Sequence, residues 1–138
     1  MYPKVVVFAC NWDGWSCIDT AANSGLHYPV SLKVLRVSCL SRVHSGLILK
    51  AFELGADGVI LLGCEEGNCH FGIDRQSTLN EYDRAGSIMD MLGIPRSNLS
   101  LIRLPAFAGQ QFVTEAMQFL EGIRRLHSVK NPIMTGAT

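Results

Sequence analysis

The chain has few charged residues and no excess of either sign. Of its 138 residues, 17% are charged, and 12 lysines and arginines balance 12 aspartates and glutamates. A protein without net charge creates no field that would attract nucleic acid or an anionic membrane surface. We therefore expect no nucleic acid and no membrane among its partners.

Long hydrophobic runs are absent as well. The opening stretch MYPKVVVFAC holds one lysine and a short apolar run, too short for a signal peptide or a membrane span. We accordingly expect a cytoplasmic protein. Since that compartment keeps thiols reduced, the five cysteines of the chain are not expected to form disulfides, and an odd number cannot all pair.

The usual nucleotide and dithiol motifs are also missing. The chain has no G-x-x-x-x-G-K-[ST], no G-x-G-x-x-G after an apolar run, and no Cys-x-x-Cys. These absences exclude the common phosphate loops and a thioredoxin-like site. Asn11, Trp12 and Asp13 follow the first apolar run, where a phosphate cradle would offer glycines and hydroxyls.

The chain does contain a regular alternation of two patterns. Short β-branched or apolar runs alternate with segments of helical periodicity. Gly55, Gly93 and Pro105 supply stop signals after three of these segments. The predicted strands cover residues 4–9, 32–38, 57–63 and 99–105, and the predicted helices cover residues 14–24, 44–54, 75–92 and 109–126.

This alternation predicts one α/β domain over residues 1–127, with helices on both faces of a four-stranded parallel sheet. Right-handed crossovers and the pairing of sequential strands favour a doubly wound, flavodoxin-like arrangement of order 2-1-3-4. Residues 128–138 are predicted to form an irregular C-terminal tail. The hydrophobic share of 48% suggests that part of the apolar surface meets a partner.

The cysteines fall at one edge of this predicted sheet. Cys10, Cys39 and Cys64 follow the first three predicted strands, Cys69 lies in the same loop as Cys64, and Cys17 starts the first helix. In the order 2-1-3 these strands are neighbours, spaced at about 4.8 Å. The carboxyl edge of an open α/β sheet is where ligands bind, so all five sulfurs can converge on one site.

The residues alone leave several chemistries open. A single free cysteine is most often a small buried hydrophobe, whereas five thiols at one edge indicate a metal or redox site. Thiolates select zinc, copper(I) or iron-sulfur clusters. The spacing differs from the paired motifs of structural zinc, while a 2Fe-2S cluster needs four ligands and accepts irregular spacing. A redox disulfide between Cys64 and Cys69 is a further alternative.

Residues beside the cysteines have roles that the sequence leaves undecided. His70 is either an exposed loop histidine, a ligand or a hydrogen-bond donor to a cluster sulfur. Arg42 is either a salt-bridged surface residue or a positive charge near an anionic cluster. Trp12 and Trp15 are interpreted as packing or interface residues, because tryptophan is enriched at protein interfaces.

Four stretches carry a resemblance to a known family. FACNW, LHYP, VLRVSCLSRV and LKAFELGADGVILLGCEEGNCHF resemble the small iron-sulfur (delta) subunit of the methyl-viologen-reducing, F420-non-reducing hydrogenase of methanogens and its relatives. The resemblance runs from about residue 4 to residue 126. Its most specific part is the string G-A-D-G-V, three apolar or small positions, and then G-C-x-x-G-x-C-H.

The resemblance implies an electron-transfer subunit that holds a 2Fe-2S cluster. Such a subunit would relay electrons from a hydrogenase or a formate dehydrogenase to the flavin subunit of heterodisulfide reductase, whose flavin bifurcates electron pairs in methanogenesis-type energy metabolism. It would perform no bond chemistry of its own and would have no catalytic residue. The competing hypothesis is a zinc-bound or metal-free adaptor domain that holds two larger subunits together.

The resemblance maps the cluster ligands onto Cys10, Cys39, Cys64 and Cys69, with one departure. The family pattern reads C-N-W-C in the first loop, whereas this chain reads C-N-W-D and has Cys17 four residues further on. If the second cysteine of the pattern is a ligand, Cys17 or Asp13 replaces it, and thiolate is the softer ligand for iron-sulfur chemistry. If it is not, the four mapped cysteines suffice.

Overall fold

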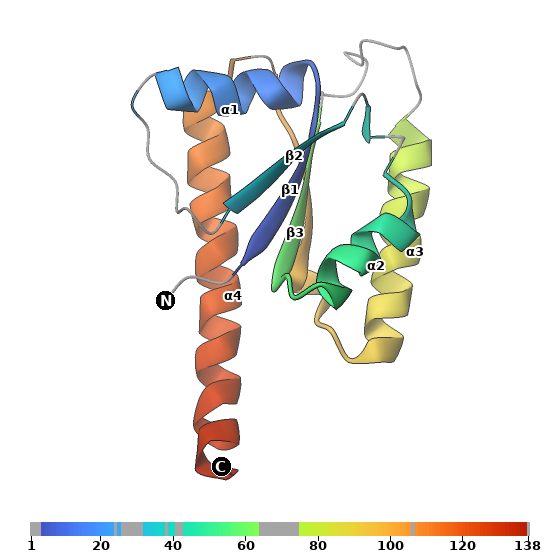
Figure 1. Ribbon diagram of the computed structural model, residues 1–138, viewed down its shortest axis with the longest axis vertical. Helices are drawn as coiled ribbons and strands as arrows, with labels where there is room; N and C mark the ends of the chain where they lie inside the picture. The colour runs from blue at the N-terminus through green and yellow to red at the C-terminus, as the bar shows by residue number, and fades with distance from the viewer. Residues whose placement is uncertain are drawn as a thin grey trace.

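The structure is a computed structural model that describes residues 4–23, 25, 32–37, 39–40, 43–63, 75–105 and 107–137. Strands and helices alternate along these residues (Figure 1). The strands are β1 (Val5–Cys10), β2 (Leu32–Val37), β3 (Gly58–Gly63) and β4 (Leu99–Arg103). The helices are α1 (Asp13–Asn23), α2 (Ser45–Glu53), α3 (Arg75–Leu92), the short 3-10 helix η2 (Arg96–Asn98) and α4 (Gly109–Ala137).

The strands form a parallel sheet of order β2-β1-β3-β4. The predicted fold class and strand order are therefore confirmed. β3 is buried along its whole length. It is a central strand covered on both faces, and such strands are continuous apolar runs in the sequence. β2 lies at the edge, and only its first residue, Leu32, is buried.

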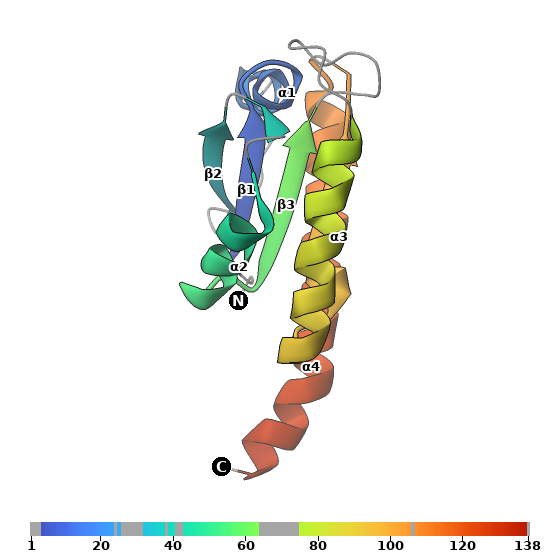
Figure 2. The ribbon, with the colours of Figure 1, turned by 90° about the vertical axis from the view of Figure 1, so that its right-hand side faces the viewer.

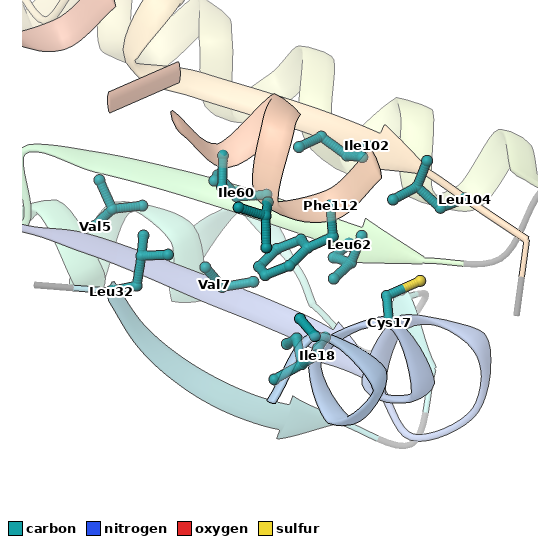
Figure 3. Packing of buried hydrophobic residues seen from close by; sticks show 14 of the residues in the cluster. Val5, Val7, Cys17, Ile18, Leu32, Ile60, Leu62, Ile102, Leu104 and Phe112 are labelled. Atoms are coloured by element: carbon teal, nitrogen blue, oxygen red, sulfur yellow. The ribbon is translucent and has the colours of Figure 1, made fainter. Parts of the chain in front are cut away.

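Two hydrophobic clusters lie on opposite faces of the sheet. α1 and α4 cover one face, where Val7, Ile60 and Phe112 are fully buried (Figure 3). α2 and α3 cover the other face around Ile48 and Met89. Burying one such side chain contributes about 1.5–3 kcal/mol, so the helices are fixed to the sheet by these two layers.

α2 and α3 end in the same way, at glycines with left-handed backbone. Gly55 has a φ of 106° and Gly93 a φ of 79°. The N–H of Gly93 bonds to the carbonyl of Asp90, and the N–H of Ile94 reaches back to Met89. These two bonds make a Schellman cap, which the sequence indicated by placing glycine just past each periodic segment.

Both views place α1 at the carboxyl ends of the strands, where β1 and β2 finish (Figures 1 and 2). α4 starts next to α1 and runs past the opposite end of the sheet towards the C-terminus. Its backbone is helical through Ala137, which differs from the irregular tail expected over residues 128–138. The last turns extend beyond the sheet (Figure 1), so packing against the strands could not mark them in the sequence.

Candidate functional site

The candidate site lies at the carboxyl ends of β1, β2 and β3. Cys10 is the last residue of β1 and pairs in register with Val37, the last residue of β2. Cys39 follows two residues after Val37, and Cys64 directly follows Gly63, the end of β3. The three strand ends are neighbours because β1 pairs with both β2 and β3.

The predicted residues Arg42, Cys64, Cys69 and His70 lie outside the described residues. Within the described ranges, no three histidine, cysteine, aspartate or glutamate side chains form a group that could hold a metal ion.

Cys10 presents a buried thiol to the start of α1. Its side chain is 3% exposed, and its Sγ accepts a hydrogen bond from the backbone N–H of Gly14 over 3.0 Å. The first N–H groups of a helix have no partner inside the helix. A sulfur that ends the preceding strand can therefore accept a hydrogen bond from one of them.

Gly14 permits this contact because it has no side chain. A Cβ at this position would lie 2.6 Å from the carbonyl oxygen of Leu62 and 3.1 Å from the Sγ of Cys10. The N-terminus of α1 thus packs directly against the backbone near the end of β3. Sequence reasoning missed Gly14, although a glycine at the start of a helix that follows a cysteine was the available signal.

Cys39 is held beside the end of β3 by its neighbour in the chain. Cys39 is 8% exposed, and Leu40 is buried in the cluster on the α2 face. A Cβ added to Gly63 would overlap the Leu40 side chain. The segment after β2 therefore crosses towards Gly63, which brings Leu40, the neighbour of Cys39, against the end of β3.

Cys17 occupies a different position from the other thiols. Its side chain is fully buried in the cluster under α4, and its Sγ donates a hydrogen bond to the carbonyl oxygen of Pro105 over 3.3 Å. Figure 3 shows Cys17 and Ile18 on α1 among the core side chains. The sulfur thus faces the segment between β4 and α4.

The surroundings of Cys17 favour its protonated form. Burial raises the pKa of the Cys17 thiol above its ordinary value of 9.0, and the negative charges of Asp13 and Cys10 act in the same direction. Hydrogen bonds from the Ala108 backbone and the Ser16 side chain act against this rise without cancelling it. A thiol must lose its proton to bind a metal, so this environment opposes ligation.

Ser16 joins the first loop to the segment between β4 and α4. Its N–H donates to the carbonyl of Trp12 over 2.9 Å, and its Oγ donates to the carbonyl of Asp13 over 2.7 Å. The same Oγ accepts the N–H of Phe107 over 3.0 Å. Sequence reasoning missed this contact, because it joins residues 91 positions apart.

The two tryptophans have different surroundings. Trp15 lies under the guanidinium group of Arg36, whose Cζ is 4.3 Å from the ring centre, and this contact ties α1 to β2. Trp12, in the loop after Cys10, is 41% exposed. Among the described helices, none is both long enough and apolar enough to cross a membrane.

The chain is similar over most of its length to a known family and to several known proteins. A family described as "Methyl-viologen-reducing hydrogenase, delta subunit" matches residues 5–127. The iron-sulfur subunit of the F420-non-reducing hydrogenase vhc of Methanococcus voltae is 36% identical over 110 residues, covering 80% of this chain and 76% of that protein. The iron-sulfur subunit of the F420-non-reducing hydrogenase of Archaeoglobus profundus is 33% identical over 128 residues, covering 93% of each chain.

A third relative is a much longer protein. It is one of the subunits of the ferredoxin:CoB-CoM heterodisulfide reductase of Methanosarcina mazei, 29% identical over 124 residues, which cover 90% of this chain and 16% of that protein. The same domain thus occurs both as a separate hydrogenase subunit and inside a reductase subunit. On the match over residues 5–127, the chain belongs to the methyl-viologen-reducing hydrogenase delta subunit family.

Proposed function

We propose that this chain is an electron-transfer subunit that carries a 2Fe-2S cluster at the carboxyl edge of its sheet. The observation that carries the proposal is the pair of buried thiols, Cys10 and Cys39, at the ends of two adjacent strands. Relatives that are matched over most of their own length are named iron-sulfur subunits. The type of cluster is our inference from the thiol-only ligand set.

The described residues fit such a group chemically. Both thiols are shielded from water, and the Cys10 sulfur accepts a hydrogen bond from the N–H of Gly14. Hydrogen bonds to the ligand sulfurs are one of the features that set the potential of an iron-sulfur cluster. We propose that Cys10, Cys39, Cys64 and Cys69 hold the cluster. When bound, it would accept and release one electron at a time, and Arg42 and His70 would adjust its potential by charge and hydrogen bonding.

We further propose that Cys17 is not a ligand. Its sulfur is engaged with the carbonyl of Pro105 inside the core, and burial keeps it protonated. A role as ligand would require α1 to rotate out of its packing against α4. Asp13, the first residue of α1, remains the alternative oxygen ligand in the first loop, although the four mapped cysteines already complete a 2Fe-2S set.

The partners are inferred from the names of the relatives. Several are subunits of a hydrogenase, and two are subunits of heterodisulfide reductases that contain this domain within a longer chain. We propose that the chain passes electrons from a hydrogenase, or a formate dehydrogenase in its place, to the flavin-carrying subunit of heterodisulfide reductase in the cytoplasm. The chain's own residues hold and insulate the cluster and carry out no bond chemistry.

Anaerobic purification tests this proposal directly. The protein should be coloured, contain about two irons and two sulfides per chain, and give an EPR signal after reduction. Stoichiometric zinc without iron would overturn it and would support the adaptor hypothesis. A colourless, metal-free protein in which Cys64 and Cys69 alone titrate with two electrons would instead support a thiol-disulfide protein.

A further inference from the structure

Phe107 combines two unfavourable features at the edge of the sheet where the thiols lie. Its backbone has a φ of 63°, and it is the one residue other than glycine with a positive φ among the described residues. Its side chain is 73% exposed. Side chains rarely adopt this backbone region, and a bulky one is strained there. The exposed ring of Phe107 adds nothing to the hydrophobic core that would offset this strain.

One hydrogen bond joins Phe107 to Ser16, and a second one fixes the Ser16 side chain. The Ser16 Oγ accepts the N–H of Phe107 and donates to the carbonyl of Asp13. Ser16 itself belongs to the first turns of α1, which start directly after the Cys10 loop. The strain at Phe107 is therefore imposed by the same element that contacts the Cys10 sulfur.

The same hydrogen-bonded unit carries a second exposed aromatic residue. The N–H of Ser16 bonds to the carbonyl of Trp12, whose side chain is 41% exposed. Trp12 stands two positions after Cys10 in the chain. Ser16 thus links two exposed aromatic residues, one from the loop after β1 and one from the segment after β4.

We propose that Trp12 and Phe107 form a docking surface for the flavin-carrying subunit of heterodisulfide reductase. This inference rests on the proposed function. Large aromatic side chains held in a fixed geometry are typical anchors of protein interfaces. Strained backbone is concentrated at functional sites, and here the strained residue carries an exposed aromatic ring.

The choice of partner follows from two observations. In the two Methanosarcina relatives, this domain is part of a heterodisulfide reductase subunit, so the domain and the rest of that subunit are held close together there. Electrons pass between centres only over short distances, so a partner must approach the edge of the sheet that carries Cys10. Trp12 and Phe107 border that edge, whereas the exposed Leu54 and Leu92 end the helices α2 and α3.

Replacing Phe107 with glycine separates docking from folding. Glycine accepts a φ of 63° without strain, so Phe107→Gly should leave the thermal midpoint and the visible spectrum of the iron-loaded protein unchanged or raise the midpoint. Its affinity for the purified flavin-carrying reductase subunit from the same organism, measured by calorimetry, should fall at least about tenfold. Trp12→Ala should weaken binding to a similar degree, and Phe107→Tyr should retain it.

Matched controls are Leu54→Ala and Leu92→Ala, which remove exposed apolar side chains elsewhere and should bind the reductase subunit with unchanged affinity. Unchanged binding by Phe107→Gly and Trp12→Ala, with normal binding by the wild type, would overturn the docking surface. An equal loss in Leu54→Ala would overturn it too, because the effect would not be local. A wild-type protein that carries its cluster but does not bind the reductase subunit would instead contradict the proposed partner.

Discussion

The backbone N–H of Gly14 donates a hydrogen bond to the Sγ of Cys10 over 3.0 Å, while the space of a Cβ at Gly14 is taken by the Leu62 carbonyl. Gly14 therefore lets the start of α1 pack against the sheet and at the same time brings its N–H to the Cys10 sulfur. Gly122, within α4, has no atom within 4 Å of such a Cβ. Replacing Gly14 with alanine therefore tests this close packing, and the same replacement at Gly122 is its control.

Gly14→Ala should lower the free energy of unfolding by about 1–3 kcal/mol, because the backbone of Leu62 cannot move aside as a side chain could. It should also lower the iron content per chain and shift the visible spectrum. Gly122→Ala should be neutral or stabilise the helix by up to about 1 kcal/mol. Urea unfolding and iron analysis of both variants check this, and a Gly14→Ala protein indistinguishable from Gly122→Ala would refute the close packing.

Cys17→Ala should keep the iron content and the EPR spectrum of the wild type. It should still cost about 1–2 kcal/mol of unfolding free energy, because it leaves a small cavity in the core and removes the bond to the Pro105 carbonyl. Cys10→Ala and Cys39→Ala serve as the contrast, since each should lose most of the iron. Loss of the cluster in Cys17→Ala would make Cys17 a ligand after all.

Asp13→Asn tests the remaining alternative in the first loop. The substitution keeps the shape of the side chain and removes its charge. If the four mapped cysteines hold the cluster, the EPR spectrum and the iron content should stay unchanged. A shifted spectrum with retained iron would identify Asp13 as an oxygen ligand.

The Cys17 thiol predicts a specific dependence of stability on pH. Its pKa in the folded chain lies above the ordinary value of 9.0, with burial as the largest cause. The folded chain therefore holds this proton more tightly than the unfolded chain, so the stabilisation is complete below 9.0 and is lost as pH rises towards the folded pKa. Thermal midpoints of the wild type should fall more steeply than those of Cys17→Ala above about pH 9. Parallel profiles would contradict the assignment.

Ser16→Ala should loosen the segment that contains Phe107. The variant removes the acceptor of the Phe107 N–H and the donor to the Asp13 carbonyl. Without these bonds the strained backbone should relax, and amide hydrogen exchange at Phe107 should become faster. Thr114→Ala is the control, because Thr114 donates to the carbonyl of Gln110 within α4, away from both segments. Equal exchange in both variants would show that Ser16 does not restrain the segment.

The fold was largely predictable because its strands are short, apolar and separated by clear stop signals. β3 is buried along its whole length, and its sequence GVILLG is apolar throughout. The predicted strand order followed from general rules of chirality and neighbour pairing rather than from particular contacts. These rules alone predict that Cys10 and Cys39 lie at the same edge of the sheet.

The orientation of Cys17 could have been read from the sequence but was not. Gly14, Cys17, Ile18 and Ala21 follow the spacing of one helix face, and all four are buried. The position of Cys17 in the chain predicts that it lies near the carboxyl edge of the sheet. The face of α1 on which it lies determines which way its sulfur faces. The backbone of Phe107 was not predictable, because a distant hydrogen bond to Ser16 imposes it.

The register of the sheet also determines when two thiols that are distant in the sequence become neighbours. Cys10 and Cys39 belong to segments 29 positions apart, and they become neighbours only after β1 has paired with β2. Parallel pairing of this kind requires the whole intervening crossover to be in place. A group that binds both thiols would therefore bind the folded chain more tightly than the unfolded chain, and its binding would stabilise the pairing of β1 with β2.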